Sequence, residues 1–353
     1  MRIPALVLTA ILTALPAFAA PPVGEIHRTV SEPAAAIRDE QHRTDLRITV
    51  WYPAAAGAAE TSIDMGPPNA PFFTLGKVAM NGAFADDKKH PVILFSHGFG
   101  GSARMMAWFG KPMAEHGYVV IAVDHPGNNG QDKMTVAGAM VWWERAEDLK
   151  WALAAALKDS AIGPHLDATR VGVAGYSLGG LTSLVLGGAR VSPEHALQFC
   201  AIQPDDGVCK PQQEFPLTID QWKQAFASDE LKSEMAVART DHSLPGVKAV
   251  FALSPVVQVL DPDSLKAMRV PVSIVVGDGD PITSPANHGG VAAKLIPGAK
   301  LSLAKGATHY TFLAECSDAA RQQIPICKTA TEQASAHALA IEEALELFDR
   351  TLR

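Results

Sequence analysis

The stretch RVGVAGYSLGG, residues 170–180, decides the fold. Residues 170–174 are a short apolar run typical of a buried strand, and residues 178–186 predict a helix that ends at two glycines. Between them, Gly175 and Gly179 frame Ser177 in the pattern G-x-S-x-G. A turn this sharp pushes the serine toward positive φ and leaves no room for side chains two positions away. We therefore predict that Ser177 is an exposed nucleophile rather than an inert serine in a glycine-rich connector.

Strands and helices alternate on both sides of this turn. Strands are predicted over residues 45–52, 91–95, 118–123, 170–174, 248–253, 271–276 and 300–304. Helices are predicted over residues 103–116, 141–157, 178–186, 291–295 and 331–353. Buried strands that alternate with helices indicate a mostly parallel sheet covered on both faces. The predicted fold class is α/β.

Two segments depart from this alternation. Residues 54–89 are rich in Ala, Gly, Pro and Asp and are expected to form a loop. Residues 191–245 contain two cysteines, several prolines and a charged helical stretch. We expect this second segment to be an insertion, or cap, over the core of one domain that spans residues 20–353.

A serine hydroxyl is a weak nucleophile without a base, and the base needs an orienting acid. After a nucleophile of this kind, the expected order along the chain is acid and then histidine. The strand at 271–276 ends in GDGDP, and the strand at 300–304 leads into GATHY. We predict Asp280 as the acid and His309 as the general base, with Asp278 as the alternative acid.

A tetrahedral intermediate also needs donors for its negatively charged oxygen. The strand at 91–95 leads into SHGFGG, where glycines let the backbone approach a substrate closely. We expect the backbone N–H groups of Phe99 and Leu178 to form this oxyanion hole.

Other side chains are expected near the site. Met105, Met106 and Trp108 follow the glycine-rich loop and either line an acyl site or pack within a helix. Of the adjacent Trp142 and Trp143, we expect one to pack in the core and the other to reach the pocket.

Two polar pairs have less specific roles. His125 follows Asp124 at a strand end and is expected to hydrogen-bond a loop or to line the pocket. Arg145 and Asp148 stand three positions apart on a predicted helix, so they either pair with each other or brace a loop.

These motifs together resemble the α/β-hydrolase superfamily across roughly residues 45 to 350. Within it, FSHGFGG, YVVIAVDHPG and GYSLGG are similar to the bacterial predicted dienelactone hydrolase group, which is related to platelet-activating-factor acetylhydrolases. The resemblance implies a serine esterase that uses no metal and no cofactor. It carries over Ser177 as nucleophile, His309 as base, and Phe99 and Leu178 as oxyanion donors.

The sequence departs from that group in two ways. Dienelactone hydrolases proper use a cysteine nucleophile, whereas this chain has Ser177. Acetylhydrolases place their acid after the strand that follows the nucleophile helix, and here that strand ends in ALSP without a carboxylate. The acid is therefore expected at Asp280, and phospholipid specificity is not implied. The alternatives are a lactone or phospholipid-acetyl hydrolase, or a non-catalytic binding protein on the same scaffold.

A dinucleotide-binding oxidoreductase is the least favoured alternative. Gly98, Gly100 and Ala103 follow a strand in a G-x-G-x-x-A pattern, and Asp124 ends the next strand. The pattern does not open a new βαβ unit, and it leaves Ser177 unexplained.

Composition limits the classes of partner. The chain has 353 residues, of which 48% are hydrophobic and 19% charged, which excludes a disordered or collagen-like protein. The net charge is −7, and no run of five Lys or Arg residues occurs, so nucleic acid and anionic membranes are unfavoured partners. We expect a small-molecule ester as partner, and the oligomeric state stays open.

The first residues, MRIPALVLTAILTALPAFAA, are typical of a secretory signal peptide. Arg2 gives the positive start, residues 5–15 the apolar stretch, and Ala17 and Ala19 the small residues before cleavage. A membrane anchor would need about 20 apolar residues, more than lie between the two prolines. A later uncharged stretch, residues 171–189, contains six glycines and is better explained by a strand and helix. We expect a periplasmic or secreted protein without stable membrane insertion.

The four cysteines form two pairs that are close in sequence. We predict disulfides between Cys200 and Cys209 and between Cys316 and Cys327, because an exported chain meets oxidising conditions. A zinc site is the less favoured alternative, since neither spacing is C-x-x-C.

Overall fold

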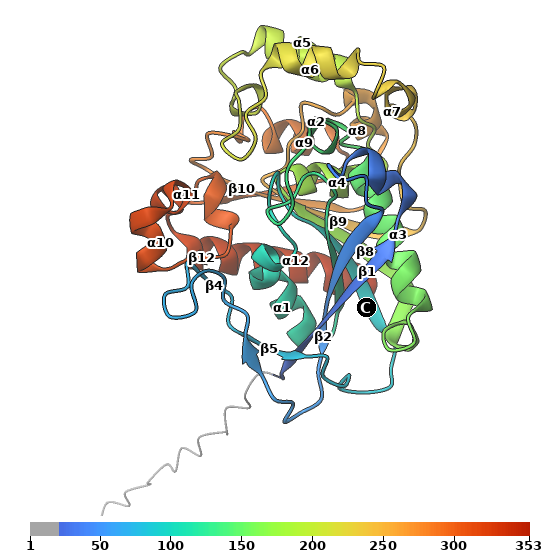
Figure 1. Cartoon of the computed structure of the whole chain (residues 1–353), viewed down its shortest axis with the longest axis vertical. Coiled ribbons are helices and arrows are strands. Elements are labelled where there is room, and N and C mark those ends of the chain that lie inside the picture. Colours follow the sequence, from blue (N-terminus) through green and yellow to red (C-terminus); the bar gives the residue numbers. More distant parts are fainter. Residues whose placement is uncertain (1–20) are drawn as a thin grey trace, which may run out of the picture.

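The computed structural model describes residues 21–353, so the predicted signal peptide over residues 1–19 lies outside the described part. The described strands form a ten-stranded sheet in the order β11-β10-β9-β8-β6-β7-β2-β1-β5-β3, and β12 pairs with β4 (Figure 1). The strands are β1 (Val23–Ser31), β2 (Asp45–Pro53), β3 (Thr61–Ser62), β4 (Phe73–Thr74), β5 (Lys77–Met80), β6 (His90–Ser96), β7 (Val119–Asp124), β8 (Leu166–Tyr176), β9 (Val247–Leu253), β10 (Val272–Gly277), β11 (Lys300–Ala304) and β12 (Glu315–Cys316). The α-helices are α1 (Ala107–Glu115), α2 (Val136–Met140), α3 (Glu144–Lys158), α4 (Leu178–Leu186), α5 (Pro193–Ile202), α6 (Ile219–Phe226), α7 (Lys232–Val237), α8 (Pro262–Ala267), α9 (Gly289–Leu295), α10 (Asp318–Gln323), α11 (Pro325–Thr329) and α12 (Gln333–Leu352).

The predicted parallel sheet forms the larger part of this arrangement. Strands β7, β6, β8, β9, β10 and β11 pair in parallel with one another. Beyond β7 the sheet continues with β2 and β1, which pair antiparallel. Because parallel strands all end at the same edge, the loops after β6, β8, β10 and β11 meet there. The predicted functional residues follow these strands.

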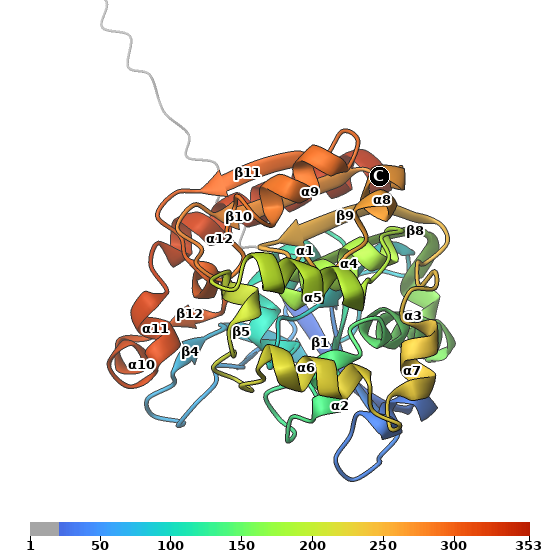
Figure 2. The ribbon, with the colours of Figure 1, turned by 90° about the horizontal axis from the view of Figure 1, so that it is seen from above.

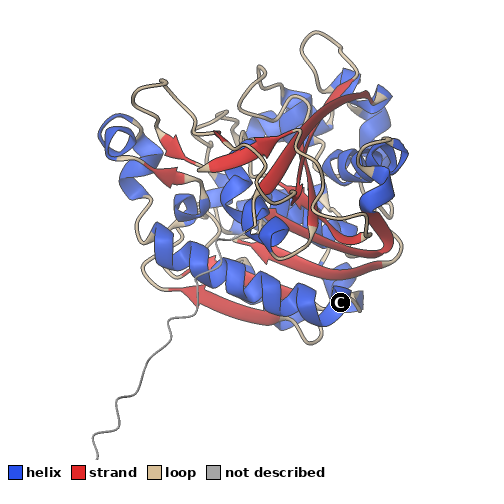
Figure 3. Cartoon of the chain, turned by 90° about the horizontal axis from the view of Figure 1, so that it is seen from below, coloured by secondary structure: helices blue, strands red, loops and turns tan. Residues whose placement is uncertain are grey.

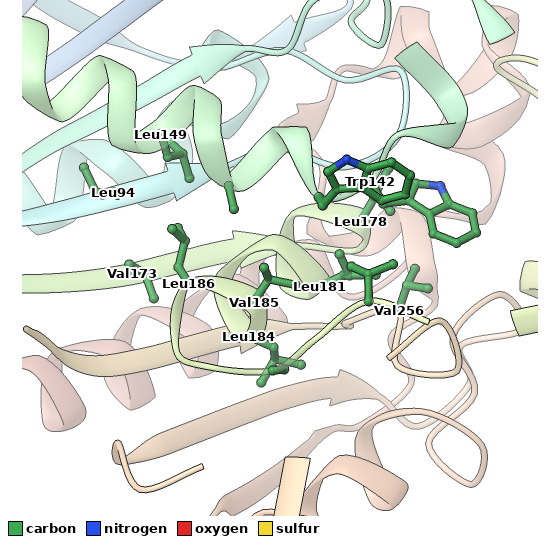
Figure 4. Close-up of a cluster of buried hydrophobic side chains, with 14 of the residues drawn as sticks. Leu94, Trp142, Leu149, Val173, Leu178, Leu181, Leu184, Val185, Leu186 and Val256 are labelled. Atoms are coloured by element: carbon green, nitrogen blue, oxygen red, sulfur yellow. The ribbon is translucent and has the colours of Figure 1, made fainter. Parts of the chain in front are cut away.

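Helices cover both faces of the sheet, as the alternating pattern predicted (Figure 3). One face packs against α1 and α12, where Phe109 lies 5.6 Å from Phe251, centroid to centroid. The other face packs against α3, α4 and α9. Figure 4 shows part of this second core, in which Leu181, Leu184 and Val185 of α4 lie among side chains of the sheet and of α3. Burial on both faces fixes the strand ends that support the site.

The prediction that residues 54–89 form only a loop is wrong in part. The short strand β5 pairs in parallel with β1, and β3 pairs with β5. The four residues KVAM are too few to show a pattern of their own. They become a strand because the backbone of β1 offers them unpaired hydrogen-bonding groups at the sheet edge.

Residues 191–245 fold mainly into α5, α6 and α7, which lie at one end of the molecule (Figure 1). Seen from above, α5 and α6 cross the middle of the view and α7 lies to one side, near α3 (Figure 2). The segment is tied to the core by Asp206. Its carboxylate accepts hydrogen bonds from Asn287 Nδ2 at 2.8 Å and lies 3.1 Å from the Nε2 atom of the fully buried His288. This attachment holds the segment beside the loop that follows β10.

Both predicted disulfides are present. Cys200 is joined to Cys209 with their Cα atoms 5.4 Å apart, and Cys316 to Cys327 with theirs 5.8 Å apart. The first bridge closes the end of α5 onto the turn that carries Asp206. Within residues 21–353, no helix has the length and apolar character needed to cross a bilayer.

A second attachment of the 191–245 segment depends on pH. His242 Nδ1 lies 2.8 Å from Glu147 Oε1 on α3. Burial opposes the charge on His242, but its hydrogen bonds to Glu147 and to the carbonyl oxygen of Val237, together with the negative charges of Glu147 and Glu144, outweigh burial and raise the pKa of His242 above its ordinary 6.5. Burial likewise opposes the charge on Glu147, yet its bonds to His242 and Lys150 hold the pKa of Glu147 below 4.5.

The His242–Glu147 pair is therefore fully charged, and most stabilising, between pH 4.5 and pH 6.5, which are the ordinary pKa values of its two groups. The contribution of His242 is complete below pH 6.5 and is lost as the pH rises through its folded pKa. The contribution of Glu147 is lost as the pH falls below 4.5 and through its own folded pKa. We predict that His242→Gln lowers the melting temperature more at about pH 5.5 than at about pH 9. An equal loss at both pH values would contradict this.

Candidate active site

Ser177 lies at the junction of β8 and α4, in the predicted strand–turn–helix. Its backbone has φ 56° and ψ −116°, a strained conformation for a residue with a side chain. A Cβ atom at Gly175 would lie 2.0 Å from the carbonyl oxygen of Gly179, and one at Gly179 would lie 1.9 Å from that of Ser96. The flanking glycines are thus required by close backbone approach, as the motif predicted.

The structure brings Ser177 and His309 together, although 132 positions separate them. The Nε2 atom of His309 lies 2.9 Å from Ser177 Oγ, within hydrogen-bond distance. The hydroxyl of Tyr176 donates to the carbonyl oxygen of His309 at 2.9 Å and so fixes the backbone of the histidine. In this geometry the imidazole can accept the proton of the serine hydroxyl.

Asp280, and not Asp278, contacts the far side of the imidazole. Its Oδ2 atom lies 2.8 Å from His309 Nδ1. Asp278 is exposed, and its Oδ1 atom accepts a hydrogen bond from the backbone N–H of Gly306 at 2.7 Å. Asp278 therefore stabilises the turn before His309 and does not contact the imidazole.

The surroundings of Asp280 keep it ionised. Its Oδ1 atom accepts backbone N–H groups from Ile282 at 2.8 Å and Thr283 at 2.9 Å, and Oδ2 accepts the Thr283 hydroxyl at 2.9 Å. Burial disfavours the charge, but His309 and these N–H donors outweigh burial and lower the pKa of Asp280 to about 2. Thr283 had no motif of its own in the sequence, and its role follows from its place in the turn after Asp280.

The loop after β6 borders the same serine. Phe99 lies next to Ser177 along both cavities that open there, and Leu178 is the first residue of α4. The first N–H groups of a helix have no partner within the helix, so the Leu178 N–H points toward the end of the helix where Ser177 lies. The loop is braced by Asn128, whose Oδ1 atom accepts the Gly100 N–H at 2.9 Å, and by Arg145, which donates to the carbonyl oxygen of His97. For Arg145, bracing a loop is thus the correct one of the two predicted roles.

A second serine, histidine and aspartate are connected beneath this loop. Ser96 Oγ lies 2.8 Å from His125 Nε2, and His125 Nδ1 lies 2.7 Å from Asp148 Oδ2. The distances match those at Ser177. Asp148 also accepts two hydrogen bonds from Arg38, at 2.8 and 2.7 Å, so it does not pair with Arg145.

Burial distinguishes the two serine–histidine pairs. Ser96, His125 and Asp148 are each 0% exposed, and the two cavities that border Ser177 do not reach Ser96 or His125. Burial and the charge of Arg145, which donates to Ser96 Oγ at 3.1 Å, lower the pKa of His125 to about 3. A substrate has no path to Ser96, so we interpret this network as a support for the loop that carries Phe99.

Asp124 does not have the free carboxylate that a dinucleotide site needs. It is 6% exposed, and Oδ1 accepts the backbone N–H of Ala103 at 2.7 Å. Its Oδ2 atom accepts Gln131 Nε2 at 2.9 Å. Both oxygens of the carboxylate are therefore used to stabilise the segment after β6. The carboxylate is not free to bind a ribose, as the dinucleotide-binding alternative would require.

The predicted pocket residues divide between the two cavities. Trp142 lines one of them, whereas Trp143 is 0% exposed in the core. Met105 and Met106 line the other cavity. Trp108 lines neither, since its indole N–H donates to the carbonyl oxygen of Phe312 and its ring stacks on His337.

Comparisons with known proteins agree with this architecture. Cutinase est2 from Thermobifida alba is 35% identical over 107 residues, which cover 30% of this chain and 32% of that protein. Cutinase 2 from Thermobifida cellulosilytica is 31% identical over 107 residues, which cover 30% of this chain and 37% of that protein. The chain thus matches about a third of the length of these curated relatives. A ferulic acid esterase from Streptomyces cinnamoneus has the same fold, with a TM-score of 0.60 and 18% identity over 96% of this chain and 92% of that chain. The model of the family described as "Alpha/beta hydrolase family" matches residues 93–322. The chain therefore belongs to the α/β-hydrolase family, as its motifs predicted.

Proposed function

We propose that this protein is an exported serine esterase that cleaves carboxylic esters through an acyl-enzyme. The observation that carries the proposal is the continuous contact from Asp280 through His309 to Ser177, at 2.8 and 2.9 Å, beside two cavities. An ionised carboxylate holds the proton on Nδ1 of the imidazole, and Nε2 is then free to accept the serine proton.

In the first half of the reaction, Ser177 Oγ attacks the ester carbonyl carbon while His309 Nε2 takes the hydroxyl proton. The carbonyl oxygen becomes negatively charged and accepts hydrogen bonds from the N–H groups of Phe99 and Leu178. When this intermediate collapses, the bond to the alcohol oxygen breaks, and His309 gives its proton to the leaving alcohol. Ser177 now carries the acyl group.

In the second half, a water molecule attacks the acyl carbon and transfers a proton to His309. The same N–H groups stabilise the second intermediate, whose collapse releases the carboxylic acid and returns the proton to Ser177 Oγ. Asp280 stays ionised throughout and stabilises the imidazolium. No step requires a metal or a cofactor.

The comparisons support the ester class without fixing a substrate. The relatives are named cutinases, and the superposed structure is named a ferulic acid esterase. The likeness to the predicted dienelactone hydrolase and acetylhydrolase group stays part of the proposal, as do lactones as alternative substrates. Export is supported by the two disulfides, because such bridges persist in oxidising compartments. Residues 191–245 are proposed to act as the cap over the site.

The test is a panel of p-nitrophenyl esters of graded acyl length, with simple lactones alongside, assayed on the wild type and on Ser177→Ala. We expect ester turnover by the wild type that is lost in the variant. The proposal fails if no ester or lactone is hydrolysed above the rate of Ser177→Ala. That result would favour a non-catalytic binding protein.

A further inference from the structure

Two cavities meet at Ser177, and they differ in their walls. We call the first the capped chamber: it is lined by Trp142, Phe215, Leu217, Trp222 and Val256, among others. We call the second the histidine-side chamber: it is lined by His309, Tyr310, Glu214 and Met105, among others. Phe99 and Ser177 border both, so one substrate bound at Ser177 can extend into each.

The chemistry of acyl transfer decides which end of an ester enters which chamber. The carbon attacked by Ser177 carries the serine oxygen, the oxyanion, the leaving oxygen and the acyl chain. His309 must protonate the leaving oxygen, so the alcohol lies on the side of the imidazole. His309 lines only the histidine-side chamber. The acyl chain therefore extends into the capped chamber.

The walls of the capped chamber suit an apolar acyl group with a substantial body. Trp142 and Trp222 meet edge to face with ring centroids 5.4 Å apart. The Trp142 indole N–H is already used, because it donates to the carbonyl oxygen of Ala139 at 2.8 Å. Among the described residues that line this chamber, the only charged side chain is Lys210, which is exposed. Figure 4 shows Trp142 near Leu178 and Val256, and all three line the same chamber as Ser177.

The 191–245 segment supplies much of this wall. Phe215, Leu217 and Trp222 belong to it, and Trp222 is 9% exposed within α6. Asp206 fixes the segment to the core, and the Cys200–Cys209 disulfide cross-links the segment internally, so the wall has a defined position. A small acetyl group would leave these aromatic faces without contacts, whereas a longer or aromatic acyl group would cover them.

We infer that the capped chamber is the acyl site and that it selects esters of bulky apolar acids, with a chain of about six carbons or more or an aromatic ring. The inference rests on the proposed function. Each methylene that leaves water for an apolar wall is expected to raise kcat/KM by about fourfold until the chamber is full. Trp222 is then a specificity-determining residue.

The experiment measures kcat/KM for p-nitrophenyl acetate, butyrate, hexanoate, octanoate and benzoate, which share one leaving group. For the wild type we expect the hexanoate value to exceed the acetate value by at least about tenfold, and by about 250-fold if all four additional methylenes are buried. Trp222→Ala is expected to lower this ratio by about tenfold while changing the acetate value by less than about threefold. Phe215→Ala, at a half-buried position in the same wall, repeats the test if Trp222→Ala does not fold.

Trp151→Ala is the matched control, because Trp151 is 45% exposed on α3 and lines neither chamber. It is expected to leave the ratio unchanged. Ethyl and benzyl esters of one acid test whether the alcohol lies in the histidine-side chamber, because they vary the leaving group and keep the acyl group constant. The inference is overturned if the wild type prefers acetate, or if Trp222→Ala alters discrimination between the two alcohols but not between acids. Loss of Ser177-dependent turnover on every ester would instead overturn the proposed function, so the two failures are distinguishable.

Discussion

Ser177→Ala is expected to lower kcat by about 10⁴–10⁶-fold, because the variant lacks the atom that forms the acyl-enzyme. The fold should persist, since the Ser177 hydroxyl contacts only His309 among the hydrogen bonds of the described chain. His309→Ala should cause a loss of similar size, because the two side chains act as one unit. Steady-state kinetics on the best p-nitrophenyl ester, with circular dichroism of each variant, checks both expectations.

Ser96→Ala is the matched control for this result. It removes a serine that also contacts a histidine, but one that is fully buried. We expect a loss of about 1–3 kcal/mol in the free energy of unfolding, because His125 and Arg145 lose a partner, and a fall in kcat of less than about tenfold. If Ser96→Ala were the inactive variant and Ser177→Ala the active one, the roles assigned to the two serines would be reversed.

Asp280→Asn is expected to lower kcat by about 10³–10⁴-fold for a reason that is visible in its contacts. Its Oδ1 atom accepts two backbone N–H groups and must remain an oxygen in the asparagine. The amide nitrogen then replaces Oδ2, which faces His309 Nδ1. An amide donor there forces the proton of the imidazole onto Nε2, where it meets the Ser177 hydroxyl and blocks acceptance of its proton.

Asp278→Asn is the control for that variant, at the exposed position two residues earlier. Its asparagine oxygen can still accept the Gly306 N–H, so we expect a fall in kcat of less than about tenfold. Comparable melting temperatures would show that both chains fold. The opposite ranking of the two variants would move the acid to Asp278.

Much of the site could be predicted from the sequence because its parts are local patterns. Ser177 stands between two glycines that the turn requires, Asp280 follows the buried strand β10, and His309 follows the edge strand β11. Parallel strands bring such strand ends to one edge, so three positions far apart in sequence had to be neighbours in space. The choice between Asp280 and Asp278 depended on which carboxylate the loop buries, and the structure provides that information.

Other parts of the site could not be predicted from the sequence, because they depend on contacts between segments that are distant along the chain. The Ser96, His125 and Asp148 network joins three elements, with Arg38 from a fourth, and none of these residues forms a motif with another. The division of the pocket into two chambers depends on where residues 191–245 fold back over the sheet. Composition marked that segment as different but gave no information on where Trp222 would lie.

The most direct test of the account is covalent labelling with a fluorophosphonate, followed by mass analysis of the peptides. The phosphorus is attacked by an activated serine oxygen and fluoride leaves, so the label marks the nucleophile itself. We expect one label per chain, on the peptide that contains Ser177, and none in Ser177→Ala. A label on Ser96, or equal labelling of wild type and Ser177→Ala, would contradict it.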